Sequence, residues 1–63
     1  MPIIQVHLLE GRTTDQKRAL VTSVTDAVVK SLGVKPEDVR IILEGMARDN
    51  YAVAGVLFSD KKG

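Results

Sequence analysis

Cysteine and tryptophan are absent from the sequence, histidine occurs once, and the only aromatic residues are Tyr51 and Phe58. The lack of cysteine excludes disulfides and thiolate metal ligands, and it is compatible with a reducing cytoplasm. One histidine cannot form a metal site unaided, although carboxylates can supply oxygen ligands. The sequence therefore gives little support to a metal centre.

An excess of one charge and long apolar runs are also missing. Nine basic and eight acidic residues leave a formal net charge of +1, so the basic face that nucleic-acid binding normally needs is not indicated. No apolar run approaches the roughly 20 residues of a membrane span, and polar residues interrupt the first segment where a signal peptide would be apolar. We expect a soluble protein of the cytoplasm that binds neither nucleic acid nor membrane.

The chain is short enough for its size to predict association. Its 63 residues make one small domain, 1–63, and such a domain buries only about 60% of the surface that its unfolded chain exposes. Disulfides and metals, which often support so small a core, are not indicated, whereas 44% of the residues are hydrophobic. We therefore expect several chains to bury apolar surface against one another.

The first half of the sequence predicts a strand followed by a helix. Residues 3–9, IIQVHLL, are rich in apolar side chains that give an alternating strand one fully apolar face. Thr13 and Gln16 have the spacing of a capping box, which opens a helix expected at about 14–32, and Gly33 suits a left-handed helix end. The apolar positions of this helix fall at helical intervals: Leu20, Val24, Ala27, Val28 and Leu32.

The second half predicts a turn, another strand and a hairpin. Pro36 favours a tight turn or a single helical turn at 35–38, and VRIIL at 39–43 is a strand dense in branched residues. The tail 46–58 combines a polar turn with short apolar pieces around Gly55, a pattern typical of a small hairpin. The last three residues are expected to fray.

These elements predict an α/β (α+β) fold built on a βαβ unit. Two strands joined through a long helix pair in parallel, with a right-handed crossover. A two-stranded sheet with one helix leaves one face and two edges uncovered, and contacts between subunits would cover both. The fold again indicates an oligomer, whose active sites would draw on several chains.

Pro2, directly before the first strand, has two interpretations. If Met1 is removed, Pro2 exposes a secondary amine, the only such nitrogen that a normal chain offers. Burial or a nearby cation lowers the pKa of an amine toward the range that a general base needs. Composition alone favours the simpler interpretation, in which a proline is tolerated at a strand start because its missing N–H does no harm there.

Arg12 and Arg40 stand near strand ends and loops, where α/β units collect ligands. A planar guanidinium matches the two oxygens of a carboxylate. Arg12 follows the Gly11 turn, and the interpretation that it is only a solvated turn residue is equally well supported there. Arg40 lies one residue past the start of an apolar strand, where an idle charge is rare, and the alternative there is an ion pair, for example with Glu44 across a subunit interface.

The remaining candidates carry weaker signals. His7 lies on the mixed face of its strand, where a lone histidine is more often structural than catalytic. Met46 and Phe58 are interpreted as packing residues. Tyr51 follows the turn-like triplet 48–50, and it is either a pocket wall with a polar tip or an interface residue.

Taken together, these stretches resemble 4-oxalocrotonate tautomerase. The resemblance rests on the opening PIIQVHLLEGR, the TxxQK-type helix start, VRIILEGMA and an aromatic residue after a short turn, and it covers essentially the whole chain. It implies the tautomerase/MIF-like fold with parallel strands, assembled as a homohexamer that is a trimer of dimers. It also reverses the interpretation of Pro2, which it implies to be a general base once Met1 is removed.

The resemblance assigns the other site residues by position. The family's two catalytic arginines fall on Arg12 and Arg40, and its pocket aromatic residue falls on Tyr51. The implied reaction moves a proton within a small anionic unsaturated oxo acid, as when 2-hydroxymuconate becomes 2-oxo-3-hexenedioate in bacterial breakdown of aromatic compounds. Arg40 would stabilise charge on the carbonyl oxygen, Arg12 would hold the far carboxylate, and Tyr51 would lower the local dielectric. This chemistry needs no metal or organic cofactor.

Two departures from the family pattern keep alternatives open. The family usually has phenylalanine at Tyr51, and its glycine-rich segment is here AVAG at 52–55. A hydratase, a dehalogenase or a carbon–carbon-bond-forming relative of the same fold would use the same amine, but 51–58 lack the acid that activates water. A non-catalytic oligomeric binding protein is the third hypothesis, because with Met1 attached the Pro2 nitrogen is an amide without useful basicity.

Overall fold

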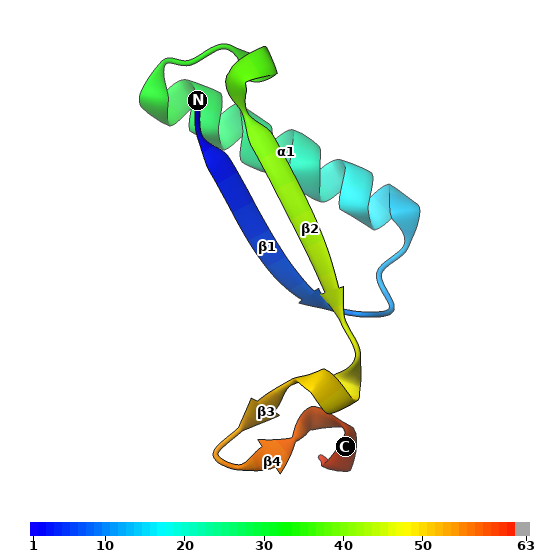
Figure 1. Ribbon diagram of the computed structural model, residues 1–63. Helices are drawn as coiled ribbons and strands as arrows, with labels where there is room; N and C mark the ends of the chain where they lie inside the picture. The colour runs from blue at the N-terminus through cyan, green and yellow to red at the C-terminus, as the bar shows by residue number, and fades with distance from the viewer. Residues whose placement is uncertain (62–63) are drawn as a thin grey trace.

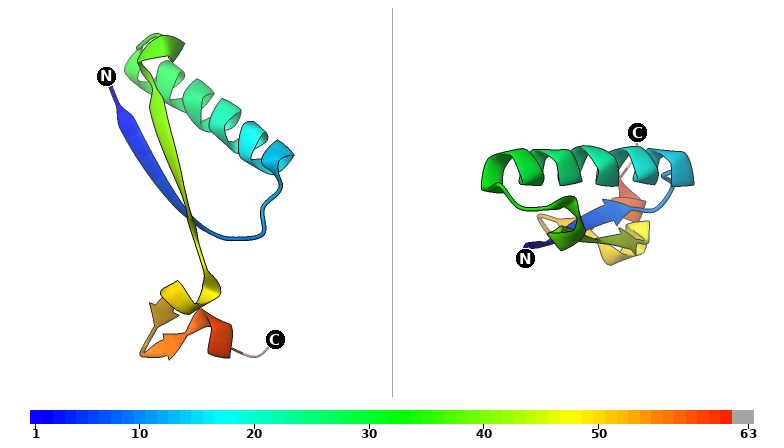
Figure 2. Two further views of the ribbon diagram at one scale, coloured as in Figure 1. Left: turned by 45° about the vertical axis from the view of Figure 1, so that its right-hand side comes forward. Right: turned by 90° about the horizontal axis from the view of Figure 1, so that it is seen from above.

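The computed structural model describes residues 1–61. Two parallel strands form its main sheet, and one long helix lies across a single face of that sheet (Figure 1, Figure 2). The elements of this unit are strand β1 (Ile3–Leu9), helix α1 (Thr14–Leu32), a 3-10 turn η1 (Pro36–Asp38) and strand β2 (Arg40–Met46). The predicted βαβ unit with parallel strands is confirmed.

Strands β1 and β2 pair over their full lengths. The register runs from Ile3 opposite Arg40 to Leu9 opposite Met46. The backbone N–H of Glu10 extends it by donating to the Met46 carbonyl oxygen at 2.9 Å. Residues that are paired in this register lie on the same face of the sheet. Each pair therefore lies either on the side covered by the helix or on the open side.

The bounds expected for the second strand, 39–43, are wrong at both ends. Val39 still belongs to the turn, because its N–H donates to the Pro36 carbonyl oxygen at 3.1 Å. At the other end, Glu44-Gly45 looks like a break in the sequence but remains in the strand as far as Met46. The ladder with β1 continues past this polar pair, and backbone pairing outweighs the local side-chain preference there.

Helix α1 begins and ends where the sequence predicts. The Thr13 hydroxyl accepts from the Gln16 backbone N–H at 3.1 Å, and the Gln16 side-chain oxygen accepts from the Thr13 N–H at 3.0 Å, which completes the capping box. Gly33 ends the helix in the left-handed region at φ 69°. Ala27 and Leu32 belong to the apolar pattern but are exposed, because a two-stranded sheet is too narrow to cover the whole stripe.

Beyond β2 the chain forms a small C-terminal unit (Figure 1). Its elements are η2 (Arg48–Asn50), β3 (Ala52–Val53), β4 (Val56–Leu57) and η3 (Phe58–Asp60). Strands β3 and β4 are antiparallel, so the predicted hairpin is confirmed. Of the three residues expected to fray, Lys61 donates its backbone N–H to the Phe58 carbonyl oxygen at 3.2 Å, and 62–63 lie outside the described residues.

A single chain encloses no core. None of residues 1–61 is fully buried, and Ile3 and Ile42 on the open side of the sheet are 57% and 46% exposed. The radius of gyration is 14.8 Å, whereas a compact chain of this length has about 11 Å. Within residues 1–61 the structure contains no helix with the length and apolar character of a membrane span. The elongated chain therefore presents much apolar surface on which another chain can pack.

Candidate active site

Pro2 and Arg40 meet where the two strands of the sheet start. Pro2 is half-buried, and its carbonyl oxygen accepts a hydrogen bond from the Arg40 backbone N–H at 3.1 Å. Arg40 is the first residue of β2, not one residue past the strand start as expected, because Val39 is held in the preceding turn. Its side chain is exposed, and no carboxylate of residues 1–61 lies within 4.0 Å of it. This end of the sheet thus places an unpaired cation beside the N-terminal segment.

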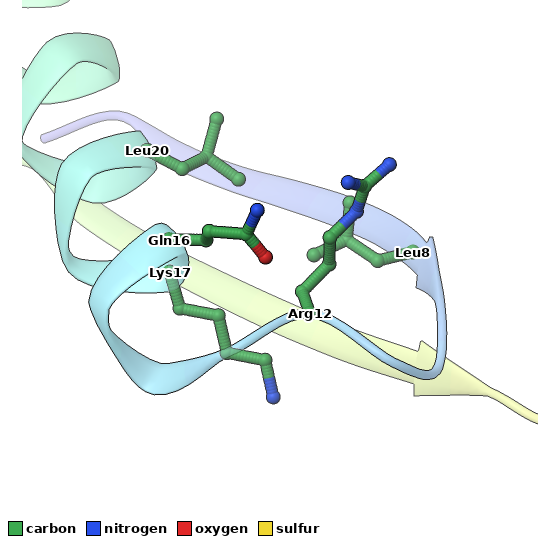
Figure 3. Close-up of a pocket in the computed structure, with 5 residues that line it drawn as sticks. All are labelled: Leu8, Arg12, Gln16, Lys17 and Leu20. Carbon is green, nitrogen blue, oxygen red and sulfur yellow. The ribbon is translucent and has the colours of Figure 1, made fainter.

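Arg12 lies at the opposite end of the sheet, in the loop after β1. It follows Gly11, whose φ of 118° is a conformation that glycine adopts readily. Its side chain borders a hollow of about 310 Å³ whose other walls are Leu8, Gln16, Lys17 and Leu20. Figure 3 shows the Arg12 guanidinium extending away from the Lys17 ammonium. The seven residues of β1 span roughly 23 Å, so Arg12 and Pro2 of one chain are too far apart to touch one small ligand.

Tyr51 belongs to the C-terminal unit, which follows the far end of β2. Its ring centroid lies 5.9 Å from that of Phe58, with the rings tilted by 56°, a favourable geometry for an aromatic pair. Tyr51 remains 40% exposed, and it lines an apolar hollow of about 430 Å³ together with Val53 and Val56. Tyr51 therefore lies with Arg12 at the end of the chain that is remote from Pro2.

A further hollow, of about 540 Å³, connects the β1 end with the C-terminal unit. Its walls include Arg12 and Arg48, two arginines from distant parts of the sequence. The sequence analysis includes Arg48 only as part of a turn and does not predict its position at this hollow. The available signal was a basic residue three positions before Tyr51, at the point where the chain leaves its second strand.

The only histidine is paired on the open face of the sheet. His7 Nδ1 lies 3.7 Å from Glu44 Oε2, and the two side chains are 54% and 58% exposed. This contact supports a structural interpretation of His7. Glu44, the alternative ion-pair partner of Arg40, therefore lies beside the histidine of its own chain. Across residues 1–61 no group of three or more His, Cys, Asp or Glu side chains is arranged to hold a metal ion.

The site residues therefore form two groups at opposite ends of one chain. Pro2 and Arg40 supply a potential base and a cation at the start of the sheet. Arg12, Tyr51 and Arg48 supply two cations and an aromatic surface at the other end. Each group therefore contains only part of the set of residues predicted to form one site.

Comparison with known proteins finds relatives that are similar to nearly the whole chain. A family model described as tautomerase enzyme matches residues 2–61. A probable tautomerase of Halalkalibacterium halodurans is 49% identical over 61 residues, which cover 97% of this chain and all of the relative. The similarity is thus continuous from Pro2 to the end of the C-terminal unit.

Solved structures agree with the sequence comparison. A 4-oxalocrotonate tautomerase isozyme from Methylibium petroleiphilum superimposes with a TM-score of 0.90 at 46% identity, over 92% of this chain and 91% of that one. A heterohexameric 4-oxalocrotonate tautomerase from Chloroflexus aurantiacus superimposes with a TM-score of 0.93 at 26% identity, over 98% of this chain and all of that one. The fold predicted from the resemblance is therefore confirmed.

Proposed function

Because the chain belongs to the tautomerase family, we propose that it is a cofactor-independent isomerase that moves a proton within a small unsaturated 2-oxo dicarboxylic acid. The substrate class is that of 2-hydroxymuconate, a dienol that becomes 2-oxo-3-hexenedioate. The observation that carries the proposal is that the half-buried Pro2 is hydrogen-bonded through its carbonyl oxygen to the backbone of Arg40, whose side chain has no carboxylate within 4.0 Å among residues 1–61. A base next to a free cation suits proton transfer that leaves negative charge on an oxygen.

In this proposal Pro2 acts after Met1 has been removed, because only then is its nitrogen a basic secondary amine. The amine takes the proton from the 2-hydroxyl group of the dienol, and the electron pair left behind spreads over the oxygen and the conjugated carbons. Arg40 stabilises the charge on that oxygen, an effect typically worth about 3 kcal/mol per donor. The protonated Pro2 then delivers the same proton to C5, so the reaction is balanced without any other reactant.

Arg12 and Tyr51 take part through a second copy of the chain. Arg12 lies beyond the far end of β1, roughly 23 Å or more from Pro2, and Tyr51 follows the far end of β2. A complete site therefore needs the far end of a neighbouring subunit against the Pro2 end. The exposed Ile3 and Ile42 provide apolar surface for such contacts. We propose a homohexamer arranged as a trimer of dimers, and the heterohexameric relative from Chloroflexus aurantiacus supports this assembly.

Within the composite site Arg12 holds the far carboxylate of the substrate and so fixes the carbon skeleton against the base. Tyr51 provides an apolar wall, which lowers the local dielectric and strengthens the charge interactions. The proposed setting is the cytoplasm, in the breakdown of aromatic compounds. Hydration or dehalogenation is the weaker hypothesis, because residues 51–58 contain no carboxylate to activate water.

Pro2→Ala tests the proposed function. Protein whose intact mass shows loss of Met1 should ketonise 2-hydroxymuconate, followed by ultraviolet absorbance. The Pro2→Ala chain should lose activity about 10²-fold or more, because general-base catalysis contributes 10²–10⁴-fold.

The other proline supplies the matched control. Pro36 begins η1 beyond the C-terminal end of the helix, and Pro36→Ala should leave the rate of ketonisation within about twofold of the unmodified chain. Full activity in Pro2→Ala, or an equal loss in both variants, would remove Pro2 from its assigned role.

A further inference from the structure

The 540 Å³ hollow between the end of β1 and the C-terminal unit has the size of a small-molecule site. It is lined by residues 7–12 on one side and by Arg48 and Phe58 on the other. Ligand pockets in proteins usually enclose about 300–1,000 Å³. The hollow is therefore large enough to admit a six-carbon diacid, and the side chains on its walls would decide which end of the molecule binds there.

Arg48 is held at this hollow by an aromatic ring and has no counter-ion there. Its Cζ lies 5.2 Å from the centroid of the Phe58 ring, which is within the range of a cation–π contact. No carboxylate of the described residues 1–61 lies within 4.0 Å of it. A guanidinium stacked on a ring still offers its N–H groups to a planar anion, and Arg48 is exposed.

The charges around the hollow favour an anion. Arg12 and Arg48 contribute two permanent positive charges, and Glu10 contributes one negative charge. The Glu10 side chain lies toward β2, with its Cγ 4.0 Å from the position that a Cβ on Gly45 would take. His7 also lines the hollow, but its Nδ1 is directed to Glu44. The hollow is therefore a cationic cleft with two independent guanidinium donors.

We propose that Arg48 is a second recognition residue for the far carboxylate of the substrate. This proposal rests on the proposed function and deepens it. Arg12 and Arg48 approach the carboxylate from two elements, one from the loop after β1 and one from η2, and each satisfies one of its oxygens. Arg48 takes no part in proton transfer. It sets the preference for substrates with two carboxylates over substrates with one.

The test compares two inert probes, hexanedioate and hexanoate, by calorimetric binding to the Met1-free oligomer. The unmodified protein should prefer the dianion, and Arg48→Gln should lower the ratio of the two affinities about tenfold, as expected for the loss of one charge-assisted hydrogen bond. Arg48→Lys should keep part of the preference, because it retains the charge but loses the fork.

Lys61→Gln is the matched control. Its ammonium also lies over the Phe58 ring, at 5.8 Å, yet Lys61 does not line this hollow. The affinity ratio should therefore stay unchanged in Lys61→Gln. An unchanged ratio in Arg48→Gln, a loss of affinity for both probes equally, or the same effect in Lys61→Gln would each overturn the assignment of Arg48.

Turnover separates this inference from the proposed function. If the dianion preference depends on Arg48 but 2-hydroxymuconate is not ketonised, the anion site stands and the proposed reaction falls. If ketonisation depends on Pro2 but the ratio of the two affinities is unchanged in Arg48→Gln, the proposed reaction stands and the assignment of Arg48 falls.

Discussion

Arg40 is the residue whose chemical role depends most on what surrounds it. It starts β2 opposite Ile3, its backbone is tied to Pro2, and its guanidinium has no carboxylate partner within residues 1–61. An unpaired cation retains its full field for charge that develops on a substrate. Its counter-ion is thus expected to be the reacting molecule.

Replacement of Arg40 by alanine should lower kcat for 2-hydroxymuconate by about 10²–10³-fold, the usual cost of removing one group that stabilises an oxyanion. KM should change much less, since the charge develops mainly in the transition state. Steady-state kinetics measure both constants. Arg18→Ala is the control, because Arg18 is paired with Asp15 at 2.7 Å on the exposed helix surface. A large rise in KM with unchanged kcat in Arg40→Ala would contradict the assigned role.

Among the elements, the β3–β4 hairpin contains the single non-glycine residue of positive φ within residues 1–61. Ala54 has φ 54° and Gly55 has φ 80°, as in the two-residue turns that match the twist of a hairpin. Left-handed backbone costs a residue with a Cβ about 1–2 kcal/mol. This turn belongs to the hairpin that follows Tyr51, so its conformation affects the proposed pocket wall.

Ala54→Gly should therefore raise the free energy of unfolding by about 0.5–1 kcal/mol, after allowance for the greater freedom of glycine in the unfolded chain. Chemical denaturation at a fixed protein concentration measures this change. Ala52→Gly is the control, since Ala52 lies in β3 and glycine weakens a strand. A loss of stability in Ala54→Gly would show that the turn has another conformation in the assembled protein.

The elements themselves were largely predictable from local signals. The Thr13–Gln16 box and Gly33 define helix α1, because capping satisfies backbone groups that are close in sequence. The length of β2 was not predictable, because Glu44-Gly45 stays in the strand only through pairing with residues almost forty positions earlier. Likewise, the aromatic contact that holds Arg48 depends on Phe58, ten residues away in another turn.

At the scale of the whole molecule, the predicted site residues of one chain lie in two groups at opposite ends. Sequence patterns place Arg12 after the first strand and Arg40 near the start of the second, so the predicted parallel pairing already separates them. In the observed parallel register, the loop after β1 that contains Arg12 lies at the opposite end of the sheet from Arg40, the first residue of β2. This separation agrees with the sequence-based expectation that the active sites draw on several chains, and the proposed site is accordingly one that forms only in the assembly.

Subunit mixing tests this division. Pro2→Ala and Arg12→Ala chains, each weak at low substrate concentration, should regain activity when they are unfolded and reassembled together. Random mixing gives about one quarter of sites with an intact Pro2 and an intact Arg12. The control mixes unmodified chains with the double variant. If the site is shared between subunits, both mixtures have the same activity. If the site lies within one chain, the first mixture has no intact sites, whereas half of the sites in the control are intact.

The most direct test of the central claim compares two forms of the same sequence that differ only in Met1. Intact mass defines the two preparations, one fully processed and one with Met1 retained, and both are assayed with 2-hydroxymuconate at equal chain concentration. The account predicts that the Met1-retaining form is slower by about 10²–10⁴-fold, because its Pro2 nitrogen is an amide and the general base is lost. Equal rates in the two forms would contradict the claim that the Pro2 amine moves the proton.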